Sequence, residues 1–333
     1  MGKLVVFRVG KGTFEQGFPV TLQIGEDGDR PTVEITGQLP PAPDIPQHYH
    51  TWQTAYRSLG IRPRLHAPAT QVTNVSVQVD CCTAAQVLGN SLNTWLHTVS
   101  FRPCREKLLE KLVPTDTVRV ILQTEDGQLQ RLPWHLWEWC DRYPKAEIAL
   151  SAPTYDQAGQ FSTPSPKVRI LAILGNSIGI DTQVDQRLLQ QLPNAEVSLL
   201  VEPQCQELTD QLWRQRWDIF FFAGHSASQG GGETNRIYLS STDSLTIAQL
   251  KYALKKAVER GLSIAIFNSC DGLGLARDLA DLQIPQIIVM REPVPDQVAQ
   301  AFLKYFLEAF AGGEPFYLAV REARERLQGL EGQ

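Results

Sequence analysis

The sequence lacks several features that would assign it quickly to a class of protein. Among its 333 residues, no apolar run approaches the roughly 20 residues of a membrane-spanning helix, and the longest, such as residues 263–267, are strand-sized. Basic residues are not in excess: 31 Lys and Arg stand against 36 Asp and Glu, giving a formal charge of −5. This balance argues against nucleic acid or an anionic membrane as a partner. The absence of a fixed-period repeat excludes solenoids and propellers.

Cysteine is sparse, and its spacing excludes two further kinds of site. The six cysteines contain no CxxC pair, which argues against a disulfide framework and against a zinc site. We therefore expect no metal and no cofactor. Five cysteines are interpreted as packing residues: Cys81, Cys82, Cys104, Cys140 and Cys205. The start of the chain lacks the apolar region and cleavage site of a secretion signal, so we expect a cytoplasmic protein.

The length suits roughly two domains of about 150 residues each. Residues 151–166 are rich in Pro, Ser and Gly and have no periodic apolar pattern, which is typical of a linker. We therefore expect an N-terminal α/β domain at residues 1–150, a linker at 151–166 and a second domain at 167–333. In the first domain, strand-like and helical segments are less clear. Its tryptophan-rich segment 133–139 is interpreted as an aromatic wedge that packs the two halves together.

The second domain alternates strand and helix patterns clearly. Short aliphatic runs predict strands at residues 168–174, 197–201, 218–223, 263–267 and 286–290, with helical patterns between them. One helix is marked by a capping box at Thr246 and Gln249 and by Gly261 beyond its end. Repeated βα units of this length predict a mainly parallel sheet with helices on both faces.

Two neighbouring predicted strands end in residues that suit nucleophilic chemistry. One strand leads into Gly224-His225-Ser226, and the next leads into Ser269-Cys270-Asp271-Gly272. In open α/β sheets, functional residues lie beyond the carboxyl ends of the strands. A thiol needs a neighbouring imidazole to hold it as thiolate near neutral pH. The pattern therefore predicts a Cys270–His225 pair at one edge of the sheet.

These motifs carry a family resemblance. The segment 268–272 has the small-Cys-variable-Gly shape seen in caspases, and His225 lies roughly 45 residues before the cysteine, near the caspase spacing of about 50. Residues 168–330 resemble a CHAT domain, a caspase-like cysteine peptidase family, and the whole chain resembles cyanobacterial members. Two further motifs support this, Leu132-Pro-Trp134 and the segment 318–324. The resemblance implies a caspase-like fold, with an N-terminal domain of regulatory or pseudo-caspase-like type.

The resemblance also implies roles for individual residues. Cys270 is the expected nucleophile and His225 the expected proton acceptor, with the backbone N–H groups of Ser226 and Cys270 holding the oxyanion. No third catalytic residue is assigned. Candidates for the substrate pocket are Asn268, Asp271, Arg236, Glu292 and Asp296. Asn268 stands where basic-specific relatives carry an aspartate, so the P1 preference stays open.

The implied activity is cleavage of protein or peptide substrates by a regulated signalling protease, with a regulatory partner or fused modules. Family members usually continue past the last helix into another strand, so a final strand is expected to be missing here. One alternative from the residues is a non-catalytic scaffold that keeps the fold and binds protein partners. Another is a small-molecule hydrolase or nucleotide-binding domain, for which the loop at 175–179 lacks the G-x-G-x-x-G pattern.

Overall fold

The computed structural model describes residues 2–59, 75–151, 167–178, 180–229, 234–269, 272–280 and 282–330. They form two compact units. Of the described residues, the first unit holds those up to 59, those from 75 to 151 and Pro315–Arg321, and the second unit holds the rest. The predicted linker lies outside the described residues apart from Ser151. The predicted domain boundaries therefore stay a prediction.

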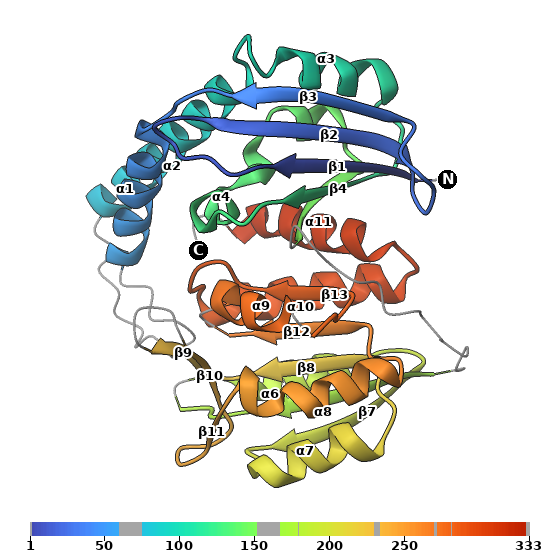
Figure 1. Cartoon of the computed structure of the whole chain (residues 1–333). Helices are drawn as coiled ribbons and strands as arrows, with labels where there is room; N and C mark the ends of the chain where they lie inside the picture. Colours follow the sequence, from blue (N-terminus) through green and yellow to red (C-terminus); the bar gives the residue numbers. More distant parts are fainter. Residues whose placement is uncertain are drawn as a thin grey trace. The chain divides into compact units, whose positions relative to one another are not determined.

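The first unit is built on a mixed five-stranded sheet with the order β3-β2-β1-β4-β5 (Figure 1). Its strands are β1 (Lys3–Val9), β2 (Phe18–Glu26), β3 (Val33–Leu39), β4 (Val118–Gln123) and β5 (Ala146–Ser151). β1 pairs antiparallel with β2 and parallel with β4. The antiparallel pairs β1–β2 and β2–β3 give the first unit a topology different from that of the second, although both are α/β as expected.

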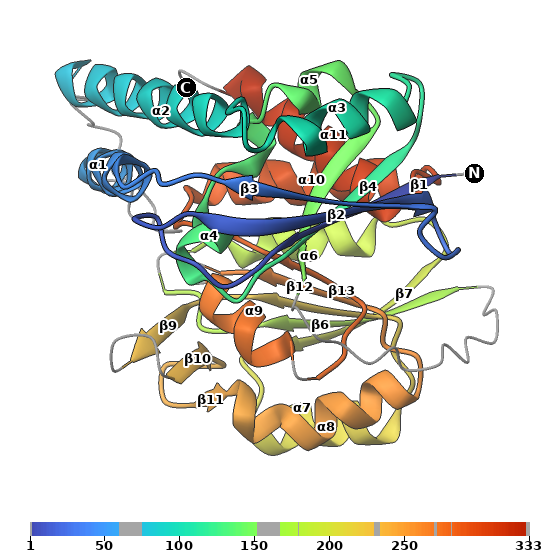
Figure 2. The same cartoon turned by 45° about the horizontal axis from the view of Figure 1, so that its top comes forward.

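Helices of the first unit connect and cover these strands. They are α1 (Asp44–Ser58), α2 (Val75–Leu96), α3 (Arg102–Lys111), α4 (Gly127–Arg131), the short 3₁₀ helix η1 (Trp134–Leu136) and α5 (Trp139–Arg142). α1 and α2 pack side by side (Figure 2). On α2, the buried residues Cys81, Ala84, Leu88 and Leu92 recur at helical spacing, so one stripe of the helix faces the core.

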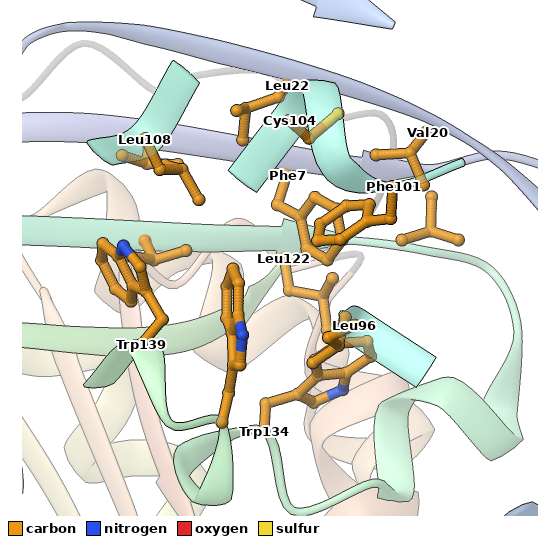
Figure 3. Packing of buried hydrophobic residues seen from close by; sticks show 14 of the residues in the cluster. Phe7, Val20, Leu22, Leu96, Phe101, Cys104, Leu108, Leu122, Trp134 and Trp139 are labelled. Atoms are coloured by element: carbon orange, nitrogen blue, oxygen red, sulfur yellow. The ribbon is translucent and has the colours of Figure 1, made fainter. Parts of the chain in front are cut away.

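The tryptophan-rich segment lies in the core of the first unit. Trp134, Trp137 and Trp139 are all buried and belong to the same apolar cluster as Phe7 and Phe101 (Figure 3). The Trp134 Nε1–H donates to the Leu129 carbonyl over 2.7 Å, which satisfies the polar end of a buried indole. The predicted wedge between the two halves is therefore wrong, because these side chains fill the core of one unit.

The cysteines of the first unit separate into buried and exposed thiols. Cys104 and Cys140 are buried in the apolar cluster, in keeping with their predicted packing role. Cys82 is exposed on α2, so its predicted packing role is wrong. It follows Cys81 directly, and neighbouring positions on a helix point in different directions.

The last helix, α11 (Phe316–Arg326), returns the chain to the first unit. Arg321 is buried there, and its guanidinium donates to the carbonyls of Tyr143 (3.0 Å), Ala146 (2.5 Å) and Cys140 (3.3 Å). Burying a charged group is costly unless it is hydrogen-bonded, and these carbonyls supply the partners. The remainder of α11 and the 3₁₀ helix η2 (Leu327–Leu330) belong to the second unit.

The second unit contains the predicted parallel sheet, with the strand order β13-β12-β8-β6-β7. The strands are β6 (Val168–Leu174), β7 (Ala195–Val201), β8 (Ile219–Ala223), β12 (Ile264–Asn268) and β13 (Gln286–Val289). All four neighbouring pairs are parallel. Every residue of β8 and β12 is buried, which explains why both read as continuous apolar runs.

Helices cover both faces of this sheet, as expected for a caspase-like fold. They are α6 (Thr182–Gln190), α7 (Cys205–Arg214), α8 (Ile247–Glu259), α9 (Gly272–Ala280) and α10 (Asp296–Ala311). Leu171, Phe220 and Phe267 belong to one apolar cluster with residues of α7, α8 and α9. Figure 2 shows α6 and α10 on the face opposite α7 and α8. The predicted capping box of Thr246 and Gln249 is confirmed at the start of α8.

The environment of Cys104 gives a pH prediction. Burial raises the pKa of its thiol to about 11 from the ordinary value of 9.0, so the folded state keeps the proton where the unfolded chain releases it. A raised folded-state pKa means that stability is full below the ordinary thiol pKa and is lost as the pH rises toward about 11. Between about pH 8 and pH 10.5, we expect Cys104 to account for about 1–2 kcal/mol of lost unfolding free energy.

Urea unfolding of the wild type, Cys104→Ala and Cys82→Ala at these two pH values checks this. Cys82→Ala should lose as much unfolding free energy as the wild type between the two pH values, because Cys82 is already exposed. Cys104→Ala should lose less. Equal losses in all three proteins would contradict the assigned role of burial.

Candidate active site

The two motif-bearing strands end at the same edge of the second sheet. β8 and β12 are adjacent and parallel, and Asn268 at the end of β12 is the register partner of Ala223 at the end of β8. His225 follows Ala223 by two positions, and Cys270 follows Asn268 by two positions. The register therefore brings the two motif segments out of the sheet at matching points. Cys270 and Asp271 themselves lie outside the described residues.

His225 is half-buried, and one of its ring nitrogens is bound to a backbone carbonyl. Nε2 lies 2.9 Å from the carbonyl oxygen of Ile178, in the loop that follows β6. Because a carbonyl oxygen only accepts hydrogen bonds, Nε2 carries the proton in this contact. In the neutral ring, Nδ1 is then the unprotonated nitrogen and can act as a base.

The Ile178 carbonyl is a group that sequence reasoning missed. It orients the imidazole in the way that a third member orients the base of a catalytic triad. Sequence patterns reveal side chains, and every residue except proline offers the same backbone donor and acceptor. No pattern in the sequence could have identified this carbonyl, because its role depends on where the loop lies.

The loop after β6 is held in place by backbone hydrogen bonds. The Gly175 N–H donates to the Ala223 carbonyl over 2.8 Å, and the Asn176 N–H donates to the Tyr238 carbonyl over 3.0 Å. A Cβ at Gly175 would lie 2.3 Å from the Tyr238 oxygen and 2.9 Å from the Phe222 ring. Gly175 is thus explained by close packing of backbone segments, which disfavours the nucleotide-binding interpretation of this loop.

A small antiparallel sheet follows His225, and sequence reasoning did not predict it. It consists of β9 (Ser226–Gln229), β10 (Thr234–Tyr238) and β11 (Ser244–Thr246), with β10 in the middle. Ser226 pairs with Ile237, and the Tyr238 N–H donates to the His225 carbonyl over 3.0 Å. Ser226 therefore begins a paired strand. The oxyanion role of its N–H stays a prediction.

Asn268 lies beneath the edge of the sheet, where it is 1% exposed. Its Nδ2 donates to Oδ1 of Asp185 on α6 over 3.1 Å, and Asp185 is 0% exposed. Sequence reasoning missed Asp185, although a signal existed. It occupies the buried face of α6 with Thr182 and Leu189, and a carboxylate on such a face needs polar partners.

Of the remaining pocket candidates, Arg236 and Asp296 form hydrogen bonds with nearby residues, and Glu292 is buried. Arg236 donates through Nη1 to the Ser244 hydroxyl over 2.7 Å, within the small sheet. Asp296 begins α10, where its Oδ2 accepts from the Asp181 N–H (3.2 Å) and from Gln300 Nε2 (2.9 Å). Glu292 follows β13 and is 9% exposed. The proposed contacts of these residues with substrate stay predictions.

Two further features are absent from the described part of the chain. No group of three or more His, Cys, Asp or Glu in that part of the chain is arranged to hold a metal ion. Among the same residues, no helix combines the length and the apolar character that a membrane span requires.

The parallel sheet with helices on both faces defines a caspase-like α/β unit, with His225 at its edge. A family model described as CHAT domain matches residues 91–333, which is most of the chain. The protein therefore belongs to the CHAT domain family, whose members are related to cysteine peptidases. The match starts within α2, so it includes part of the first unit as well as the whole parallel sheet. A comparison with curated proteins found no match.

The packing at Gly175 gives a prediction about stability. In Gly175→Ala, the added methyl group would meet the Tyr238 carbonyl and the Phe222 ring, and a backbone carbonyl cannot turn away as a flexible side chain can. We expect a loss of about 1–3 kcal/mol of unfolding free energy. Urea unfolding followed by circular dichroism would measure it.

Gly89→Ala is the matched control. Gly89 lies inside α2, where the nearest atom to an added Cβ is Leu136 Cδ1 at 3.6 Å, an ordinary contact. Alanine should stabilise the helix there by about 0.5–1 kcal/mol. If both alanine variants proved equally stable, close packing would not be the reason for glycine at position 175.

Proposed function

We propose that this protein is a caspase-like cysteine endopeptidase in which Cys270 is the nucleophile and His225 is the base. The observation that carries the proposal is the hydrogen bond from His225 Nε2 to the Ile178 carbonyl, which leaves Nδ1 to accept a proton. The register between Ala223 and Asn268 supports it, because both motifs follow matching points of neighbouring strands. Membership of the CHAT family agrees with protein substrates.

The chemistry proceeds in two halves. In the first, the Cys270 thiol gives its proton to His225 Nδ1, and the sulfur attacks the peptide carbonyl carbon to form a tetrahedral oxyanion. The backbone N–H groups of Ser226 and Cys270 would stabilise this oxyanion. The C–N bond then breaks, the imidazolium returns the proton to the leaving amine, and a thioester remains. The Ile178 carbonyl stabilises the imidazolium while it exists.

In the second half, water hydrolyses the thioester. His225 Nδ1 takes a proton from water, and the oxygen attacks the thioester carbon. The C–S bond breaks, the carboxylic acid leaves, and the proton returns to sulfur. A free thiol of this kind persists best in a reducing compartment, which supports the expected cytoplasmic setting. In this proposal the first unit is regulatory.

Labelling with a peptidyl acyloxymethyl ketone tests the proposal. We expect the native protein to be labelled at Cys270, and Cys270→Ala to abolish that labelling. His225→Ala should slow the labelling by about 10²–10⁴-fold, because the base that removes the thiol proton is lost. The modified residue is identified by peptide mass spectrometry.

His97→Ala is the matched control. His97 also binds a backbone carbonyl through its ring, with Nδ1 2.8 Å from the Asn93 oxygen, but it lies on the first unit. Its removal should leave the rate unchanged. Labelling that persists in Cys270→Ala would contradict the assigned nucleophile. If Cys270 is labelled but no protein or peptide is cleaved, a non-catalytic scaffold becomes the better interpretation.

A further inference from the structure

β10 touches the segments that surround the proposed site. Its last residue, Tyr238, donates its N–H to the His225 carbonyl and accepts at its own carbonyl from the Asn176 N–H, both over 3.0 Å. The backbone of Tyr238 is thus hydrogen-bonded both to His225 and to the loop that contains Ile178. The same strand also reaches α9, the helix that follows the Cys270 motif.

Asn235 makes the contact between β10 and α9. It is 3% exposed, and its Nδ2 donates to Oδ2 of Asp278 on α9 over 2.9 Å. The same side chain lies against Gly274, where a Cβ would come within 2.1 Å of Asn235 Oδ1. Gly274 and Asp278 are four residues apart, so they lie on the same face of α9. Asn235 therefore contacts two successive turns of one helix face.

This double contact constrains the rotation of α9 as well as its distance from β10. An apolar side chain at position 235 could fill the same space, but it would not select Asp278 as a partner. A hydrogen bond between buried or half-buried groups is directional, so this bond favours one orientation of α9 relative to β10. The absence of a Cβ at Gly274 lets the amide come this close.

The position of α9 matters because the helix begins at Gly272, two positions after Cys270 in the sequence. The N-terminal end of a helix carries a partial positive charge, which lowers the pKa of a thiol placed near it. The Gly272 N–H is already bound to the Met290 carbonyl over 3.1 Å, which ties the start of α9 to the end of β13. Further along α9, Asn235 joins the helix to β10 through its hydrogen bond to Asp278.

We propose that Asn235 is a positioning residue that holds α9 in the orientation in which Cys270 reacts as a thiolate. The inference rests on the proposed function for its link to Cys270. Its structural half, that Asn235 orients α9, can be measured without any activity.

Besides His225, the proposed base, charged groups on α9 and on the elements that pack against it could affect the pKa of the Cys270 thiol. Those on the helix are Arg277, which is exposed, and Asp278; β10 carries Arg236, which is bound to Ser244, and β13 carries none. The charged side chains of α8 are exposed or half-buried: Lys251, Lys255, Lys256 and Glu259.

The test compares Asn235→Ala, Asp278→Ala and Asp278→Asn with the wild type. The measured quantity is the rate constant for alkylation of Cys270 by iodoacetamide at about pH 7 and about pH 10, resolved by peptide mass spectrometry. We expect the two alanine variants to react roughly 3- to 10-fold more slowly at the lower pH, as a weakened helix-terminus effect implies. At the higher pH, where the thiol ionises in every variant, the rates should converge. Asp278→Asn keeps an acceptor oxygen and should react like the wild type.

Ser244→Ala is the matched control. Ser244 lies in the same small sheet and accepts a hydrogen bond from Arg236, and the contact it loses does not involve α9. It should alkylate at the wild-type rate. Wild-type rates in Asn235→Ala at the lower pH would overturn the proposal. Equal slowing at both pH values would also overturn it, because access to sulfur would then have changed and thiolate stability would not.

Hydrogen exchange separates this inference from the proposed function. If wild-type Cys270 reacts no faster than it does in the denatured protein, the proposed function fails. In that case, the hydrogen-exchange rates of α9 amides in Asn235→Ala and Ser244→Ala still test whether Asn235 orients α9. Faster exchange in α9 only for Asn235→Ala supports its orienting role, and unchanged exchange overturns it.

Discussion

The candidate site depends on the parallel register of β8 and β12. Both strands are wholly buried, so a slip by one residue would move every side chain to the opposite face and disrupt its packing under the helices. That constraint makes Asn268 the partner of Ala223 and carries the His225 and Cys270 motifs out of the sheet at matching points. Phe220, Phe222 and Phe267 belong to the apolar cluster that includes residues of α7, α8 and α9, and the burial of their rings favours this register.

Backbone hydrogen bonds position the His225 ring and the loop after β6. The Ile178 carbonyl holds the His225 ring, and the Tyr238 peptide joins the His225 segment to the loop after β6. The contact at Tyr238 needs close approach of main chains, which is why glycine stands at position 175, where a Cβ would collide with the Tyr238 oxygen. At Gly274 the neighbouring atoms belong to the Asn235 side chain. The side chains that support the edge from below, Asn268 and Asp185, are both buried. Buried hydrogen-bonded groups therefore lie beside the candidate site.

The first unit has its own core and its own sheet topology, and the family match nevertheless starts inside it, at residue 91. The residues matched include β4, β5 and the segment with the buried tryptophans. Arg321 donates to the carbonyls of Cys140, Tyr143 and Ala146, which follow the tryptophan-rich segment. The matched residues therefore include both Arg321 and the carbonyls that it binds.

Much of the second unit could be predicted from the sequence alone. Continuous apolar runs and capping residues predicted five parallel strands and the start of α8, because burial and helix termini impose local patterns. The pairing of His225 with Cys270 also followed from the order of strand ends, as a prediction. Local patterns did not reveal the Ile178 carbonyl, the three-stranded sheet of β9–β11, Asp185 under Asn268 or the return of Arg321 to the first unit. Each of these depends on segments far apart in sequence, and only the tertiary structure decides which backbone groups and buried polar atoms meet.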